Sequence, residues 1–420
     1  MNSEETDATE KKLFERRYDL DWFRTIAVLL VFLFHSMLIF SLAGIGNISI
    51  LNNEFHVLLD IIVLLLVSIG MPLFFIISGA GTYYALKIIK NTDNLDNKLF
   101  IKARFVRLMI PFFIAIFTYI SLISYAGRIR PYYNNQPFEG NFIDHYFNGY
   151  LFGGLRGLQE GATFLWTGDH LWYLIILFSF SLIFLPLFLL FEKEKNRERL
   201  SKIAKRLEKT GLIYLLIIPP IFFVGFDLGM ANLGGDISKI WRFLFPITGG
   251  WSVLMYIPYF IYGYLFTSHD KQFKKSLEKN SLPALYIAIL TAILGLPLLF
   301  SFLLTSQGDL SLLGLFTSRA LLLTFGWSII IILLSLVRKY LSFNHKWLKF
   351  LNEITLPFYI LHMVVLIVVA YFIVQLNLGV FMKLFLLIFI SLIIILSLVL
   401  IIRQANILRF IFGMKLKKKT

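Results

Sequence analysis

Residues 18–43, YDLDWFRTIAVLLVFLFHSMLIFSLA, combine an apolar run long enough to cross a membrane with ionisable side chains. Arg24 and His35 are eleven residues apart, so at about 100° per residue they share one face of a helix, with Asp21 near the same stripe. An arginine at the centre of a spanning helix costs about 2.5–3.5 kcal/mol on insertion scales, so such groups normally face a protein interior or a watery cavity. We therefore expect a functional site along this stripe.

The composition of the chain identifies its class. Hydrophobic residues make up 58% of the 420 residues, the mean hydropathy is +0.76 and there are 44 Phe, which exceeds what a soluble globular domain carries. The sequence predicts an all-α, polytopic membrane protein. The chain has no cysteine, which excludes disulfides, thiolate metal sites and cysteine nucleophiles, and no other metal site is expected.

Apolar stretches of about 20 residues between charged breaks predict the membrane spans. The second stretch is longer than one crossing needs, so either Pro72 kinks it or its first part, Phe55 to Gly70, forms a separate interfacial helix. This leaves ten or eleven helices. The ten expected spans lie near 24–43, 56–87, 108–126, 170–191, 211–229, 247–267, 283–304, 316–337, 355–374 and 380–402.

Lysine and arginine are concentrated in alternate loops. Of the 40 such residues, 32 lie in six segments, whereas the intervening loops hold five. By the positive-inside rule both termini are cytoplasmic, which requires an even number of crossings and favours ten. Residues 1–17 then form a cytoplasmic tail, 18–402 an uncleaved transmembrane domain and 403–420 a basic cytoplasmic tail. The basic segments are 1–17, 87–107, 193–209, 271–279, 338–349 and 403–419.

The net charge of +15 is explained by this topology and by contact with anionic membrane lipids. Nucleic-acid binding is not expected, because no recognised nucleic-acid-binding module accompanies the basic loops.

Five further side chains each have two readings. Arg104 and Arg107, at i and i+3 beside the third span, suit either phosphate recognition or anchoring at the lipid interface. His170, at the outer start of the fourth span, either orients an acceptor or transfers a proton, and Trp172 lines a sugar platform or belongs to an aromatic belt. His362, inside the ninth span, either bonds to a neighbouring helix or completes a polar cavity.

Together these positions outline a route across the membrane. The arginines lie toward the cytoplasmic side, His35 in the outer half of its span and His170 at the outer mouth. Such a route suits a donor that enters from inside and an acceptor that arrives from outside. Histidine is the side chain best able to remove a proton from a hydroxyl near neutral pH.

Four ordered motifs in the chain resemble those of the membrane acyltransferase 3 family. The resemblance covers roughly residues 16 to 190, and the second half is similar in hydropathy, in span number and in the segments IYGY (261–264) and YILH (359–362). The branch that it most resembles is that of the glucan biosynthesis protein C, a succinyltransferase of periplasmic glucans. The motifs are YDLDWxR (18–24) with His35, FFIISG (74–79), RxxRLxxP (104–111) and HLWY (170–173).

The resemblance implies an O-acyltransferase of the plasma membrane that takes an acetyl or succinyl group from cytoplasmic acyl-CoA. The acceptor would be a hydroxyl of a cell-envelope carbohydrate, and no cofactor would be bound permanently, since acyl-CoA is the donor substrate. Arg24 and His35 match the family's essential pair, and Arg104 and Arg107 its Arg-x-x-Arg pair. The remaining candidates, for an acceptor site or cavity, are Asp21, His170, Trp172 and His362.

Chemistry suggests a role for each matched residue. We assign His35 as general base toward the acceptor hydroxyl or as a transient acyl carrier, and Arg24 to the thioester or its developing oxyanion. The Arg104–Arg107 pair is assigned to the CoA phosphates.

Two other classes of function compete with this prediction. A transporter or exporter of a small polar or glycan substrate would share the spans, the buried charges and the basic face, but the ordered motifs argue against it. A non-catalytic scaffold would tolerate loss of His35, and the stripe in the first span argues against that. The acyl group, the acceptor and the oligomeric state stay open.

Overall fold

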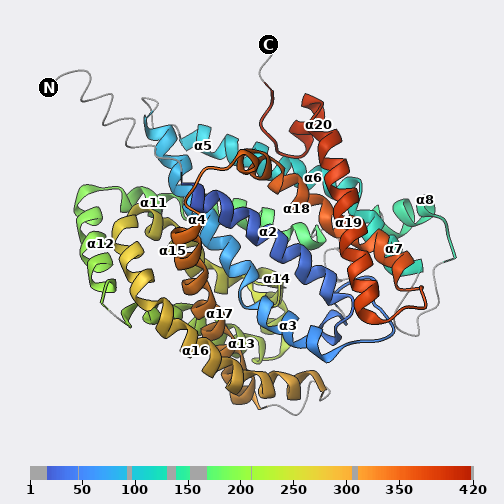
Figure 1. The fold of residues 1–420 in the computed structure, drawn as a ribbon, viewed down its shortest axis with the longest axis horizontal. Helices are drawn as coiled ribbons and strands as arrows, with labels where there is room; N and C mark the ends of the chain where they lie inside the picture. The colour runs from blue at the N-terminus through green and yellow to red at the C-terminus, as the bar shows by residue number, and fades with distance from the viewer. Residues whose placement is uncertain are drawn as a thin grey trace.

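Long helices dominate the computed structural model, which describes residues 17–45, 47–91, 97–129, 139–151, 168–209, 211–304 and 311–417 (Figure 1). All but Arg17 of the expected N-terminal tail and residues 418–420 of the basic tail lie outside these ranges. Of the outer segment between the third and fourth spans, residues 130–138 and 152–167 also lie outside. The described first half contains α2 (Tyr18–Leu38), η1 (Leu42–Gly44), α3 (Val57–Val67), α4 (Gly70–Asn91), α5 (Asn97–Arg104), η2 (Phe105–Met109), α6 (Ile110–Phe117), α7 (Ile120–Ile129), α8 (Phe142–Asp144), η3 (His145–Leu151), η4 (Asp169–Leu171), α10 (Trp172–Ile183), α11 (Leu185–Phe191) and α12 (Glu194–Leu207).

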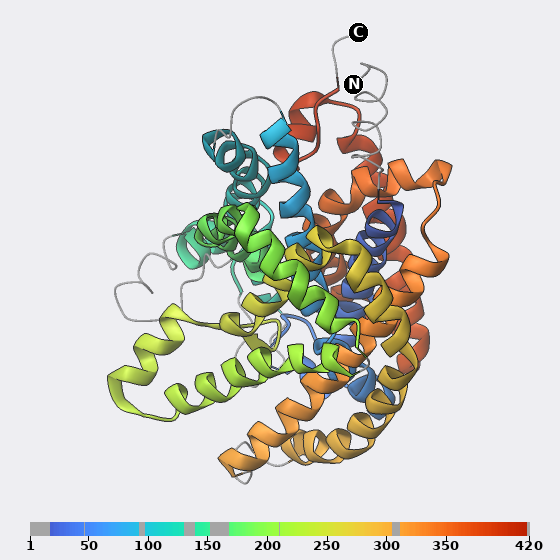
Figure 2. The same cartoon turned by 90° about the vertical axis from the view of Figure 1, so that its left-hand side faces the viewer.

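The second half carries the longest helices. Two of its helices, α13 and α14, project from the bundle as an arm (Figure 2). In order the elements are η5 (Leu212–Ile217), α13 (Ile218–Ala231), α14 (Gly235–Leu244), β1 (Ile247–Thr248), β2 (Trp251–Ser252), η6 (Val253–Met255), α15 (Tyr256–Ser268), α16 (Asp270–Leu304), α17 (Leu312–Tyr340), α18 (Lys346–Ile373), α19 (Val380–Ile402) and α20 (Asn406–Ile411).

In the described part of the chain, eight helices are long and apolar enough to cross a membrane. A ninth is added if the bent pair Asp169–Ile183 and Leu185–Phe191 is one span. The bend of 50° comes where Pro186 opens the second helix of the pair, since proline cannot donate the backbone hydrogen bond that would continue the first. The prediction of an all-α polytopic membrane protein is confirmed.

The long second stretch is divided into two helices. It breaks at Ser68 and Ile69, so α3 ends before Pro72, which lies in the first turn of α4. Proline is tolerated there because the first-turn N–H groups have no partner within the helix. The two helices together still form one candidate span, Val57–Ile88, so the break lies within that span and ahead of Pro72.

The apolar helix expected at 247–267 begins later than the sequence suggested. Its first residues form the hairpin β1–β2, in which Thr248 lies opposite Trp251. The loop residues Gly249 and Gly250 have φ of 58° and 86°, as a type I′ turn requires, and glycine adopts these angles without strain. The apolar helix that follows is the shorter Val253–Ser268.

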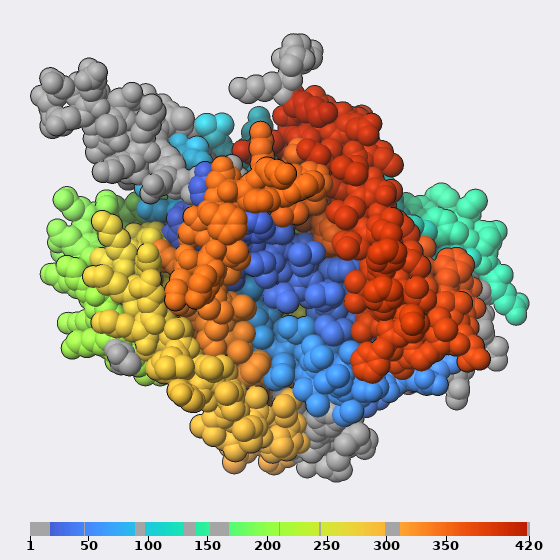
Figure 3. Space-filling model, viewed as in Figure 1, coloured from blue at the N-terminus to red at the C-terminus, as the bar shows by residue number. Residues whose placement is uncertain are grey.

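Helix α18 lies within the bundle, packed against α2 and α19, while α4 packs against α15 and α16 against α17. Part of α2 is visible between α18 and α19 on the face shown in Figure 3. The α4–α15 crossing depends on two glycines. A Cβ at Gly79 would overlap the carbonyl of Phe260, and one at Gly263 would overlap the carbonyl of Ile76. Small residues thus allow the two backbones to touch.

An ion-pair cluster joins the start of α2 to α16 and α17. Arg17 pairs with Asp19 at 2.5 Å and with Asp270, and Arg338 pairs with the other oxygen of Asp270 at 2.5 Å. The cluster joins the basic segments 1–17 and 338–349 through Asp270, the residue before the basic segment 271–279.

Candidate functional site

Three arginines line one cavity of about 270 Å³. Arg24 reaches it from α2, Arg104 from the end of α5 and Arg107 from the π-helical turn η2. That turn precedes Pro111, which has no N–H to donate to the carbonyl of Arg107, and a wider turn is one way to accommodate the loss. Elsewhere the wall of this arginine cavity comes from α4, α10 and α18.

The arginine cavity is positively charged. No carboxylate lines it, and none of the three arginines forms an ion pair with a carboxylate of the described residues. Arg104 Nη2 donates to Thr82 Oγ1 at 2.8 Å. Arg107 is exposed, while Arg24 and Arg104 are partly buried. Three clustered guanidinium groups without counter-charges favour an anionic ligand.

Three histidines from different parts of the chain form a second cluster. His362 Nε2 of α18 lies 3.2 Å from His35 Nδ1 of α2. The ring of His170, from η4, lies edge-on to that of His362 with centroids 5.0 Å apart. His170 and His362 are buried, with 5% and 1% of their surfaces exposed. The first helix, α2, and the helix α18 thus contribute histidines that meet directly.

The hydrogen bonds of the cluster assign the tautomers. His362 Nδ1 lies 2.5 Å from the carbonyl of Tyr359, and because a carbonyl only accepts, Nδ1 carries the proton. A neutral His362 then accepts at Nε2, so His35 donates from Nδ1 and keeps a lone pair on Nε2. A proton-accepting nitrogen is therefore available on His35.

His170 is assigned in the same way. Its Nε2 donates to the carbonyl of Ile360 at 3.1 Å, which leaves Nδ1 as an acceptor. That Nδ1 is buried and has no hydrogen-bond partner among the described residues. Nδ1 of His170 is therefore a second proton-accepting nitrogen in the cluster, besides Nε2 of His35.

A small cavity of about 60 Å³ lies beside this histidine cluster. His35, His170 and Trp172 line it, and so does Tyr359, which also lines the arginine cavity. The hydroxyl of Tyr359 donates to the carbonyl of His170 at 2.5 Å, which fixes the ring. Tyr359 therefore stands between the arginines and the histidines.

The structure also places the other candidates. Trp172 lines the histidine cavity and stacks on Tyr256, with centroids 5.7 Å apart and an interplanar angle of 26°. His362 bonds to His35 of a neighbouring helix and lines neither cavity. Asp21 lines neither cavity.

Sequence reasoning missed several residues of the two cavities. Tyr359 was part of a motif segment but received no role. Asn352, whose side-chain nitrogen and oxygen are buried without a partner among the described residues, lines the arginine cavity. Tyr173, the last residue of the expected motif HLWY, lines the arginine cavity as well, and its hydroxyl bonds to Ser78 Oγ. The available signal was a polar side chain within a span otherwise built from apolar residues.

His35 and His362 share a hydrogen bond, whereas His170 bonds to the carbonyl of Ile360 and contacts His362 through its ring. Within the described ranges, no group of three or more His, Asp or Glu side chains is arranged to hold a metal ion.

A sequence model of the acyltransferase 3 family, described as an acyltransferase domain, matches residues 17–403. The chain belongs to this family. It is a multi-pass membrane acyltransferase, and the family match includes all three arginines and all three histidines described above. Comparisons with curated proteins and with solved structures find no match.

Proposed function

We propose that this member of the acyltransferase 3 family is an O-acyltransferase of the plasma membrane. It transfers an acetyl or succinyl group from cytoplasmic acyl-CoA to a hydroxyl of a cell-envelope carbohydrate. One observation carries the proposal: an anion-attracting cavity and a proton-accepting histidine cluster lie on two sides of a single side chain, Tyr359.

The donor would occupy the arginine cavity. Its phosphates would bind Arg104 and Arg107, whose planar guanidinium groups donate paired hydrogen bonds to phosphate oxygens. A volume of about 270 Å³ is small for a whole cofactor-sized ligand, since drug-sized molecules occupy about 300–1,000 Å³. The nucleotide part would therefore extend through the mouth at Arg107, with the acyl end directed toward Arg24 and Tyr359.

His35 would act as the general base. Its Nε2 takes the proton from the acceptor hydroxyl as the hydroxyl oxygen bonds to the thioester carbonyl carbon. The carbon–sulfur bond then breaks, and the departing thiolate receives that proton from His35. Arg24 stabilises the negative charge on the carbonyl oxygen. In a variant of this reaction, His35 Nε2 first displaces the CoA thiolate and carries the acyl group. The acceptor hydroxyl then attacks the acyl carbon, the bond to His35 breaks, and the hydroxyl proton passes to the thiolate.

His362 would be a positioning residue in this reaction. Its bond to His35 Nδ1 at 3.2 Å keeps the lone pair of His35 on Nε2, which faces away from His362. In a neutral imidazole, the hydrogen bond that one ring nitrogen makes decides which of the two nitrogens carries the proton.

The acceptor would approach on the side of His170 and Trp172. An aromatic face beside a histidine suits a sugar ring, and the resemblance to the glucan biosynthesis protein C branch supports a glucan as acceptor and succinyl as the acyl group. The small size of the histidine cavity, about 60 Å³, suits one hydroxymethyl group of such a chain and not a whole sugar.

Transfer of radiolabel tests the proposal. Membranes containing wild-type protein receive labelled acetyl-CoA or succinyl-CoA, and alkali-labile label in envelope carbohydrate is counted. We expect transfer by the wild type and a loss of about 10²–10⁴-fold in His35→Ala. His56→Asn is the matched control, because His56 caps α3 and lines neither cavity, and asparagine also serves as an N-cap.

Equal labelling by wild type and His35→Ala would remove His35 from the reaction. No labelling by the wild type with either donor and several acceptors would favour the transporter alternative. Insertion of each variant is checked by its melting temperature in detergent.

A further inference from the structure

The segment that follows the last span folds back onto the arginine cavity. It contains α20 and the residues after that helix, where the sequence predicted only a basic cytoplasmic tail. In the structure, Gly413 packs against Arg107 and Leu356, both of which line the arginine cavity. The segment therefore lies directly behind the wall of that cavity. We call residues 403–414 the C-terminal clasp.

The contact at Gly413 is made by the backbone. Helix α20 ends in two hydrogen bonds, from Met414 N–H to the carbonyl of Arg409 at 2.7 Å and from Gly413 N–H to the next carbonyl at 3.1 Å. This pattern is the Schellman motif, which places a glycine in the left-handed conformation, and Gly413 has a φ of 65°. A Cβ on Gly413 would lie 2.6 Å from the carbonyl oxygen of Arg107 and 2.8 Å from Leu356 Cδ2. Only glycine therefore lets the chain lie this close to both walls.

Ion pairs fix the C-terminal clasp to α18. Glu353 of α18 follows Asn352, which lines the arginine cavity. One carboxylate oxygen of Glu353 pairs with Arg403 at 2.8 Å and the other with Arg409 at 2.7 Å. Arg409 is only 5% exposed, and its Nε also donates to the carbonyl of Lys415 at 2.7 Å. Because a buried charge is destabilising unless it is paired, these contacts hold the clasp in one position.

The clasp meets the cavity wall where Arg107 has little support from its own helix. Arg107 lies in the π-helical turn η2, and Pro111 has no N–H to donate to its carbonyl. Gly413 packs against that same carbonyl, and a Cβ on Gly413 would also lie 3.1 Å from Pro111 Cγ. The position of Arg107 therefore depends on a contact from outside its own helix.

We propose that the C-terminal clasp is a positioning element of the donor site. It holds the Arg107 turn against α18 and so sets the affinity of the arginine cavity for the donor; this rests on the proposed function, in which Arg107 binds the CoA phosphates. Recognition of phosphate by a guanidinium group depends on the direction of its N–H groups. No residue of the clasp lines the arginine cavity or the histidine cavity, so the clasp acts through the cavity wall.

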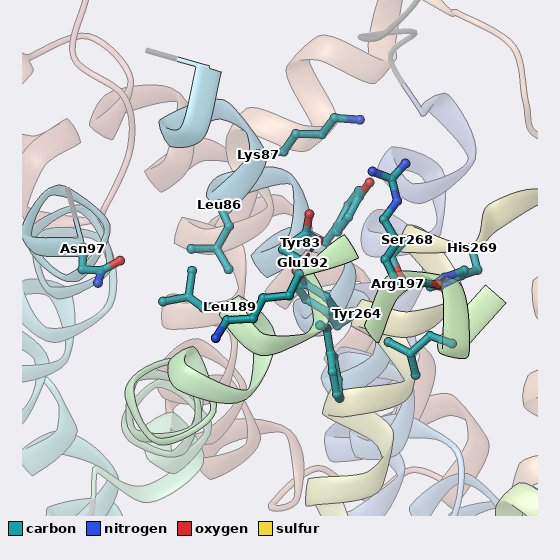
Figure 4. A pocket seen from close by; sticks show the side chains of 13 residues that line it. Tyr83, Leu86, Lys87, Asn97, Leu189, Glu192, Arg197, Tyr264, Ser268 and His269 are labelled. Carbon is teal, nitrogen blue, oxygen red and sulfur yellow. Dashed lines mark hydrogen bonds between the residues drawn. The ribbon is translucent and has the colours of Figure 1, made fainter. Parts of the chain in front are cut away.

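Another cavity, of about 560 Å³, provides a contrast (Figure 4). It lies along a different face of α4, where Tyr83 and Lys87 line it, and it shares no lining residue with the arginine cavity. No residue of the clasp lines it either. A donor bound there would therefore not respond to a change in the clasp.

Two alanine variants of the full chain, both at positive φ, test the proposal. Gly413 has a φ of 65° and Gly211 a φ of 88°, but a Cβ on Gly211 would meet no atom within 4 Å. Binding of CoA to each purified protein in detergent is measured by calorimetry. We expect Gly413→Ala to raise the Kd for CoA by about 2- to 30-fold, the size of effect that a substitution has on a site it does not touch. Gly211→Ala should leave the Kd unchanged.

Steady-state transfer separates positioning from a general loss of folded protein. Gly413→Ala should raise the Michaelis constant for acyl-CoA and leave kcat at saturating donor unchanged, because the histidine cluster is untouched. A loss of folded protein would instead lower kcat and leave the Michaelis constant unchanged.

Glu353→Gln tests the second anchor and replaces Gly413→Ala if alanine at position 413 prevents folding. Glutamine keeps the shape of the side chain but not the charge that holds Arg403 and Arg409. Loss of a nearby negative charge would by itself tighten the binding of an anion, so a higher Kd for CoA is specific to lost positioning. Glu278→Gln, which removes one end of an exposed ion pair, is the control. A Kd that falls or stays unchanged in Glu353→Gln would contradict the proposal.

Hydrogen exchange distinguishes this proposal from the proposed function. Without any donor, the backbone amides of residues 104–112 should exchange faster in Gly413→Ala and Glu353→Gln than in their controls. If the wild type neither binds CoA nor transfers an acyl group, the proposed function is contradicted, and exchange alone then decides the role of the clasp. Equal exchange in the clasp variants and their controls would overturn the proposal, as would equal CoA affinities where the wild type binds CoA.

Discussion

Replacing His362 tests whether the histidine pair orients the catalytic imidazole. His362→Leu removes the acceptor for His35 Nδ1 and keeps a buried apolar side chain of similar bulk at a position that is 1% exposed. A neutral hydrogen bond contributes about 0.5–1.5 kcal/mol, which corresponds to a fall in kcat of about 2- to 13-fold. The effect should be far smaller than that of His35→Ala.

His362→Gln is the conservative variant. Its side-chain oxygen can reach the place of the imidazole Nε2 and accept from His35, so we expect kcat to recover toward the wild-type value. The Michaelis constant for acyl-CoA should stay unchanged in both variants, because His362 does not line the arginine cavity. Steady-state labelling kinetics at varied donor concentration give both constants.

Three results would refute this reasoning. One is an unchanged kcat in a well-inserted His362→Leu protein. Another is an equal loss in the leucine and glutamine variants, which would mean that packing and not hydrogen bonding matters. The third is a change confined to the Michaelis constant, which would place His362 in donor binding.

The remaining predictions concern donor binding, packing and pH. Arg104→Ala should raise the Michaelis constant for acyl-CoA by about 10-fold or more, since a hydrogen bond to a charged group contributes about 1.5–3 kcal/mol. Lys102→Ala, at an exposed position, is the control. Equal Michaelis constants in the two variants would contradict the assignment of Arg104 to donor binding. Gly79→Ala should destabilise the protein by about 1–3 kcal/mol through overpacking against α15, whereas Gly229→Ala, which meets no atom within 4 Å, should not lower the melting temperature. Burial, and then the charge of a neighbouring arginine, lower the pKa of His145. The folded state therefore binds this proton less readily than the unfolded state, so stability falls as pH decreases below about 6.5. From pH 7 to 5, the melting temperature of His145→Gln should decrease less than that of the wild type. Equal decreases in the two proteins would exclude His145 as the cause.

The sequence predicted the helical membrane class because hydropathy and charge are local properties of the chain. It also predicted that Arg24 and His35 share a helix face, since that depends only on the helical repeat. The start of α15 was missed, although Gly249-Gly250 before Trp251 is a recognisable hairpin signal. That signal was hidden in a stretch of high overall hydropathy.

The meeting of His35 with His362 could not be predicted from periodicity. It depends on α18 lying against α2, and no local pattern states which helices are neighbours. Tyr359 illustrates the same limit. Its place between two cavities depends on how α18 packs against its neighbours and on the bond to the His170 carbonyl. The sequence showed only a tyrosine at the start of the segment YILH.

The place of Tyr359 has a consequence for the bilayer itself. A protein that transfers chemical groups between two aqueous compartments could also let protons and ions leak through it. Such a leak would dissipate the electrochemical gradients that the membrane maintains. Here the arginine cavity and the histidine cavity are separate. The ring of Tyr359, held by its bond to the His170 carbonyl, lines both of them. Under the proposed reaction the membrane can pass an acyl group outward while staying tight to protons and ions.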